Sequence, residues 1–379
     1  INYFLRFSGF TKPDLLPFLS VLGVVGLILI VLEAALDLEL LKEKIGLIVT
    51  SLLVALIGLV LTSYFSALVL TFLIDVDLFK ALLFSIPLSI LGSAVILPSV
   101  DDVEKDRREF IIYESTFSDI LGLVGFYAVL TMASSTQGEN VSLNVLGNLI
   151  FTVVFSMIVS YILIYVFQNI RGHVKLFLLI AVLLLLYAIG KMLHLSSLII
   201  ILVFGIMLNN YRVFFKGDLM RLINVEKVNS VLEDMKVVTA ETAFVVRTFF
   251  FIVFGWSVYL GSLLNLKVIG VGLIVLIVIY VVRAFVLFCF KGKKLFLELF
   301  LAPRGLVTIL LFFAIPTELS LGKEFQGVLL FVILISCICM TQALIIYKKQ
   351  KSKLKTLEND LEINNDLEKL NSNTDLENK

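Results

Sequence analysis

The 379-residue chain has few charged residues, histidines and cysteines. Only 16% of its residues are charged, and it has two histidines and three cysteines. A soluble domain carries about a quarter charged residues, so the composition excludes one. The cysteines (Cys289, Cys337 and Cys339) lie in apolar runs without metal-ligand spacing to the histidines, which argues against a zinc site or a bound cofactor. No nucleophile–histidine pair or phosphate-binding loop favours an enzyme, and no basic groove suggests a nucleic-acid partner.

Long apolar runs dominate what is there. Hydrophobic residues make up 60% of the chain, and runs of about 20 apolar residues, enough to cross a bilayer as a helix, recur along it. The sequence therefore predicts an all-α polytopic membrane protein with a transmembrane domain at 1–347 and a polar tail at 348–379. Eleven spans are expected, at 15–36, 46–73, 79–99, 110–133, 143–167, 174–190, 195–209, 237–260, 266–290, 296–317 and 325–347.

The loops between these spans differ in charge. Most of their lysines and arginines fall on one side of the membrane, including Lys105, Arg107 and Lys291, and few fall on the other. Because basic loops stay in the cytoplasm, that side is predicted to be cytoplasmic. The count of spans then places the tail in the cytoplasm and the start of the first span outside.

The segment 110–126 holds the side chains that cost most free energy to place in a membrane. Glu114, Ser115, Ser118 and Asp119 stand inside an apolar run, where an acid costs about 2.5–3.5 kcal/mol on insertion scales. Ser115 and Asp119 are four residues apart, so they share one helix face and can offer oxygens to a small cation. Glu114 points elsewhere, which indicates a basic partner on another helix. The alternative is a pair of tolerated buried acids.

Two other spans contain helix-breaking residues. Pro87, Gly92 and Ser93 fall within 79–99, and Pro303 precedes Arg304 within 296–317. Interrupted helices in opposite halves of a chain indicate a transporter site between inverted repeats, although small residues also serve ordinary helix packing. Arg304 would balance charge there.

Three further charges fall in or near the spans. Glu33 stands close to the predicted cytoplasmic end of the first span, where an acid can also reach the interface. The partner of Arg247 stays open. Arg283 is near enough to a span end to reach water, and we assign it no role.

These segments resemble the monovalent cation:proton antiporter superfamily, in its sodium/proton exchanger branch. The sequence ESTFSDILGLVGF at 114–126 is similar to the branch's Glu-Ser-x-x-Asn-Asp motif. RTFFFIVFG at 247–255 and APRGLVTILLFF at 302–313 are similar to two further family helices, and 81–98 resembles the broken helix of the core. Family members commonly have thirteen helices and form homodimers, so the resemblance implies an inverted-repeat fold with two crossing broken helices, eleven of its thirteen spans being present.

The resemblance also implies roles. Asp119 is expected to bind the cation, Na⁺ most of all, or the proton, with Ser115 as a hydroxyl ligand and main-chain carbonyls near Leu91 and Gly92. Glu114 is expected to pair with Arg304 across the core. Glu33 falls in a helix that adds a second ion-coordinating acid in some members.

Two departures from the family pattern bear on the site. The asparagine before the key aspartate is Ser118 here, so that position carries no charge and no amide. The family's Thr-Asp or Thr-Ser-Pro in the broken helix is Leu91-Gly92-Ser93 here. A carbonyl ligand survives the second change, whereas the threonine hydroxyl is lost.

The predicted function is exchange of a monovalent cation, Na⁺ or also Li⁺ or K⁺, for H⁺ across the cell membrane. One titrating carboxylate predicts one cation per proton, hence electroneutral exchange, unless Glu33 also titrates. The alternatives are a K⁺/H⁺ exchanger, an organic-anion transporter that uses Arg247 and Arg304, and a non-transporting sensor on the same scaffold.

Overall fold

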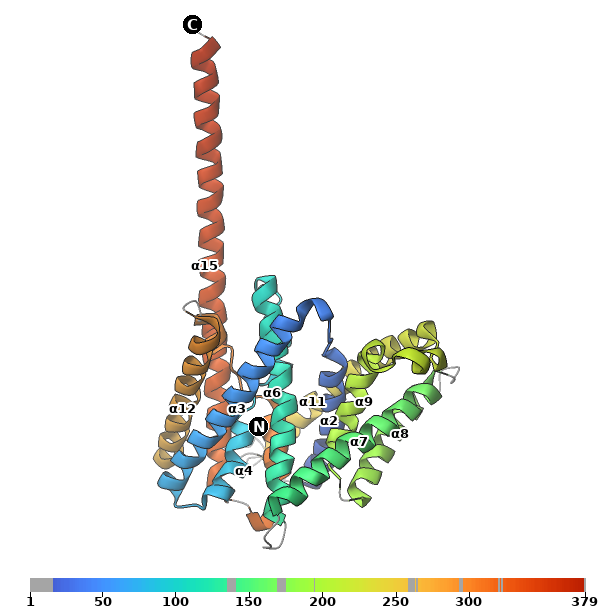
Figure 1. The fold of residues 1–379 in the computed structure, drawn as a ribbon. Coiled ribbons are helices and arrows are strands. Elements are labelled where there is room, and N and C mark those ends of the chain that lie inside the picture. The colour runs from blue at the N-terminus through green and yellow to red at the C-terminus, as the bar shows by residue number, and fades with distance from the viewer. Residues whose placement is uncertain are drawn as a thin grey trace, which may run out of the picture.

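The computed structural model describes residues 16–134, 141–168, 175–193, 195–257, 263, 265–292, 296–319, 321 and 323–377. These residues form helices joined by short connections (Figure 1). The longer helices are α2 (Leu16–Asp37), α3 (Ile45–Ile74), α6 (Lys105–Ser134), α7 (Val141–Phe167), α8 (Lys175–Met192), α9 (Ser197–Asn209), α11 (Val225–Ser257), α12 (Leu266–Lys291) and α15 (Lys323–Glu377).

Each predicted span contains helix in the structure, and span residues 15, 174 and 258–260 lie outside the described residues. Within the described residues, seven helices are long and apolar enough to cross a membrane, and the number eleven stays a prediction. The helix that contains the span 237–260 is longer than that span, because α11 begins at Val225. The last helix, α15, runs on from the apolar segment into the polar tail and projects beyond the rest of the molecule (Figure 1).

The helices pack as two groups. The first comprises α3, α6, α12 and α15 with the short helices between them, and the second comprises α2, α7, α8, α9 and α11. In Figure 1 the two groups occupy opposite halves of the molecule, and α6 stands where they meet. Contacts of α6 with α2, α7 and α9 join the groups.

Two short interrupted helices cross inside the first group. The first consists of α4 (Leu78–Ser89), an extended segment at 90–92 and the short helix α5 (Ser93–Ile96). The second consists of α13 (Phe296–Phe300), an extended segment at 301–305 and α14 (Leu306–Phe313). Both breaks were predicted from the sequence, although the first begins after Ser89 and leaves Pro87 within α4.

The two extended segments touch at their glycines. The amide of Gly92 donates a hydrogen bond of 2.8 Å to the carbonyl of Pro303. A Cβ atom added to Gly92 would lie 2.9 Å from the Cα and N atoms of Gly305, and neither backbone atom can rotate away. Absence of side chains is therefore what lets the chains cross this closely.

We predict that Gly92→Ala destabilises the protein by about 1–3 kcal/mol, the usual cost of overpacking. The measurement is the unfolding midpoint of the detergent-solubilised protein. Gly270→Ala on α12 is the matched control, because nothing lies within 4 Å of a Cβ there. A midpoint for Gly92→Ala equal to that of the control would contradict the close crossing.

Candidate functional site

Asp119 lies half-way along α6, next to the crossing, and is only 3% exposed. Its Oδ2 atom accepts a hydrogen bond from the hydroxyl of Ser93, at the first position of α5. Its Oδ1 atom has no hydrogen-bond partner within the described residues. A buried oxygen without a donor costs about 1–3 kcal/mol, so this atom is poised to take a proton or a cation.

Ser93 was not among the residues expected to contact Asp119. The threonine hydroxyl of the family motif is absent at Leu91, but the hydroxyl of Ser93, two residues later, reaches Asp119. Ser115, as predicted, is buried one turn before Asp119 on the same face of α6. Its hydroxyl donates to the carbonyl of Ile112 at 3.1 Å, which leaves the lone pairs of its oxygen for another ligand.

Ser118 and the carbonyls of the first break hold the extended segment in place. The hydroxyl oxygen of Ser118 accepts a hydrogen bond of 3.0 Å from the amide of Leu91. The carbonyl of Leu91 accepts from the amide of Ser93, and the carbonyl of Gly92 accepts from the amides at the start of α5. Ser118 therefore supplies the hydrogen-bond acceptor for the Leu91 amide, which the interruption of the helix leaves without a helical partner.

Arg304 lies in the second break and is only 2% exposed. Its Nη1 donates a hydrogen bond of 2.9 Å to the carbonyl of Ile90, which follows the last turn of α4. A cation at the carboxyl end of a helix is favourable because the helix dipole is negative there. Arg304 thus ties one break to the other, while no carboxylate in the described residues forms an ion pair with it.

The predicted pairing of Glu114 with Arg304 is wrong. Glu114 is 1% exposed, and its two carboxylate oxygens accept hydrogen bonds of 2.8 and 3.1 Å from Arg283 on α12. Arg283 was given no role from the sequence, since it stands only two turns from the end of α12. The side chain nevertheless turns into the protein, where it is 8% exposed.

Arg283 also supports the second interrupted helix. Its Nε and Nη2 atoms donate to the carbonyl of Glu298 in α13, at 3.0 and 2.8 Å. The Glu298 carboxylate in turn accepts two hydrogen bonds, of 2.8 and 2.5 Å, from Arg107 at the start of α6. These contacts form a chain of charges that fixes α6, α12 and α13 around the crossing.

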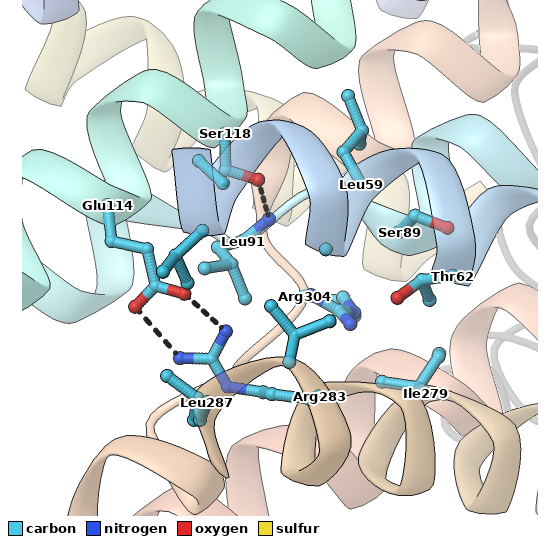
Figure 2. A pocket seen from close by; sticks show the side chains of 14 residues that line it. Leu59, Thr62, Ser89, Leu91, Glu114, Ser118, Ile279, Arg283, Leu287 and Arg304 are labelled. Carbon is cyan, nitrogen blue, oxygen red and sulfur yellow. Dashed lines mark hydrogen bonds and ion pairs between the residues drawn. The ribbon is translucent and has the colours of Figure 1, made fainter. Parts of the chain in front are cut away.

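A small cavity lies among these groups (Figure 2). Its volume of about 20 Å³ is enough for one water molecule. Glu114, Ser118, Arg283 and Arg304 line it together with Thr62 and Ser89, and Figure 2 shows the bidentate pair of Glu114 and Arg283 at one side and Arg304 at the other. Glu114 and Arg304 therefore face one cavity without touching.

The partner of Arg247, left open by the sequence, is Glu33. Their side chains form an ion pair of 2.5 Å between α11 and α2, both in the second group of helices. This ion pair therefore joins α2 to α11 within the second group of helices.

A buried acid with a free oxygen, placed beside two interrupted helices where two helix groups meet, is an arrangement typical of secondary transporters. The chain belongs to the sodium/hydrogen exchanger family: the family model described as "Sodium/hydrogen exchanger, transmembrane" matches residues 4–346. A search among curated proteins gave no match.

Two solved structures share the fold of this chain. One is the sodium proton antiporter MjNhaP1 from Methanocaldococcus jannaschii at pH 8, with a TM-score of 0.65 and 19% identity over 85% of this chain and 84% of that chain. The other is an electron-microscopy structure of MjNhaP1, with a TM-score of 0.57 and 17% identity over 87% and 82% of the two chains. The predicted antiporter fold is confirmed, and the chain is an integral multi-pass membrane protein of the cation/proton exchange class.

Proposed function

We propose that the protein exchanges Na⁺ for H⁺ at Asp119. The observation that carries this proposal is the pair of carboxylate oxygens of Asp119: Ser93 donates to one, and the other is buried without a partner among the described residues. Carboxylate and hydroxyl oxygens are hard ligands that suit a small, hard cation. Ser115 adds a further oxygen on the same face of α6. Li⁺ and K⁺ are the other candidate cations.

Competition for one carboxylate is sufficient to couple the two ions. Asp119 holds either a proton or a cation, so transport of one ion across the membrane requires transport of the other in the opposite direction. The site lies where the two groups of helices meet, and movement of one group along the other would expose Asp119 to the two sides in turn. The transport rate should pass through a maximum with pH, because acid protonates Asp119 and alkali removes the protons to be exchanged.

The stoichiometry follows from the neighbouring charges. Ser118, next to Asp119, carries no charge, and Glu33 is paired with Arg247. The exchange is electroneutral where Glu33 stays ionised in this pair, because one titrating carboxylate is then left for each cation. The same ion pair weighs against an organic-anion transporter, because Arg247 is neutralised and Arg304 is bonded to a carbonyl.

Orientation and assembly complete the proposal. By the positive-inside rule, the basic loops support a cytoplasmic carboxyl end of α15 in a protein of the cell membrane. The resemblance to the antiporters supports a homodimer.

The test is Na⁺-driven pH change in proteoliposomes, with the membrane potential either free or collapsed by valinomycin and K⁺. We expect equal proton flux in both conditions, and the same result for Glu33→Gln if that variant folds. Flux that follows the potential in the unaltered protein would overturn the electroneutral assignment. Parallel runs with Li⁺ and K⁺ identify the cation, and binding without flux for all three would indicate a sensor.

A further inference from the structure

Three helices of the first group change from apolar to charged at one common level. The apolar run of α12 ends at Lys291, that of α15 ends at Tyr347, and that of α6 begins at Phe110. The ammonium group of Lys291 lies 3.4 Å from the centre of the Phe110 ring, and the guanidinium group of Arg107 lies 5.7 Å from the centre of the Tyr347 ring. These contacts place the three ends together, at what we take as one surface of the membrane.

Directly beyond Tyr347, α15 is rich in lysine. Lys349 and Lys353 are exposed and lie on one face of the helix, since they are four residues apart. No ion pair joins either of them to a carboxylate within the part of the chain that ends at residue 353, where the described side chains of α15 end. The charge of these two lysines is therefore available at the surface where α15 leaves the membrane.

The neighbouring lysines of α15 are held by a loop of the protein. Lys348 forms an ion pair of 2.7 Å with the Asp102 carboxylate, and Lys351 donates a hydrogen bond of 2.8 Å to the Asp102 carbonyl. Lys348 lowers the pKa of Asp102, so this acid stays ionised at neutral pH. Asp102 belongs to the connection between the first interrupted helix and α6, the helix that carries Asp119.

The charge of the tail changes sign further out. Glu358, Asp360 and Glu362 follow the lysines in the sequence. Since a helix rises 1.5 Å per residue, Glu358 is about 15 Å beyond Lys348 along α15. The helix continues outward (Figure 1), so its basic turns lie next to the membrane surface and its acidic turns lie away from it.

We propose that Lys349 and Lys353 bind the phosphate groups of anionic phospholipids in the adjacent leaflet, and that Asp102 competes with these lipids for Lys348. Basic clusters that directly follow a transmembrane helix attract anionic headgroups in this way. The ion pair of Lys348 and Asp102 is largely exposed, with side-chain exposures of 56% and 67%. Exposed pairs are weak, so lipid phosphate can replace the carboxylate.

The test uses the full-length protein in mixed detergent micelles that contain phosphatidylglycerol or phosphatidylcholine, with retained lipid counted by native mass spectrometry. We expect Lys349→Gln/Lys353→Gln to lower the apparent affinity for phosphatidylglycerol about thirtyfold, because each lysine near an anionic surface contributes about fivefold. Affinity for phosphatidylcholine should not change. The matched control is Lys80→Gln/Lys267→Gln. It removes two exposed lysines from the first turns of α4 and α12, which are predicted to lie on the other side of the membrane.

Asp102→Asn tests the competition. This variant releases Lys348 and should raise the affinity for phosphatidylglycerol up to about fivefold. Equal retention by the double variant and its control, or no change in Asp102→Asn, would overturn the corresponding half of the proposal. Displacement of the lipid by millimolar inorganic phosphate would assign the site to a soluble anion instead. Since lipid retention needs no transport, failure here leaves the proposed exchange reaction untouched.

Discussion

Replacing Asp119 with asparagine is expected to reduce Na⁺-driven proton flux to the level of protein-free liposomes while the protein stays folded. Asparagine has the shape of aspartic acid, and its side-chain oxygen can still accept the hydrogen bond of Ser93. It carries no negative charge to bind a cation and no group that titrates near neutral pH. Both substrates of the proposed exchange therefore lose their ligand in one step.

The measurement combines flux and stability. Proton flux is recorded with a pH-sensitive dye in proteoliposomes, and the unfolding midpoint is recorded in detergent. The matched control is Asp75→Asn, which makes the same chemical change at an exposed residue after α3. Asp75 has a positive φ of 54°, a backbone conformation that asparagine also tolerates. Na⁺-dependent flux in a folded Asp119→Asn protein would remove Asp119 from the mechanism.

The fold was largely predictable from the sequence because the membrane imposes it. A segment in lipid must satisfy its own backbone hydrogen bonds, so each long apolar run becomes a helix. The breaks were predictable as well, since Gly92, Pro303 and Gly305 interrupt two such runs. The sequence did not reveal that Gly92 and Gly305 touch, so that the lack of a side chain at each lets the two breaks cross.

The partners of the buried charges were less predictable. Helical periodicity relates residues within about two turns, whereas Glu114 and Arg283 are 169 residues apart and Glu33 and Arg247 are 214 apart. Nothing local favours one of these pairings over another. The sequence contained the arginines that Glu114 needs, but the choice between Arg283 and Arg304 depends on how α12 packs against α3 and α15.

Ser93 illustrates a different limit. Comparison with a family motif registers a residue as present or replaced at one position, and here the replacement suggested a lost ligand. The hydroxyl that reaches Asp119 belongs to the first residue of α5, because the helix restarts directly after Gly92. The signal was the serine itself, a small hydroxyl residue at the restart of an interrupted helix.

The second large effect is expected at Arg283. Replacing it with methionine leaves the carboxylate of Glu114 buried without a cation, and it removes the donors to the Glu298 carbonyl. Breaking a buried pair by removing one partner costs about 3–5 kcal/mol. We therefore expect Arg283→Met to lower the stability by that amount in equilibrium unfolding in mixed micelles with a denaturing detergent.

The matched control is Lys44→Met. Lys44 forms an ion pair of 2.8 Å with Glu109, at the same N-terminal end of α6, but the two side chains are 33% and 22% exposed. Hydrated pairs of this kind contribute little to stability. A loss in Arg283→Met no larger than that in Lys44→Met would show that the buried pair does not hold the helices together.

A double-mutant cycle then decides which arginine serves Glu114. Combining Arg283→Met with Glu114→Gln should recover much of the lost stability, because the uncompensated charge disappears. Combining Arg304→Met with Glu114→Gln should give losses that nearly add, since Arg304 is bonded to the carbonyl of Ile90 and only shares a water-sized cavity with Glu114. Strong coupling to Arg304 and none to Arg283 would restore the pairing expected from the sequence. The opposite result would establish that α12, through Arg283, secures the helix that carries Asp119.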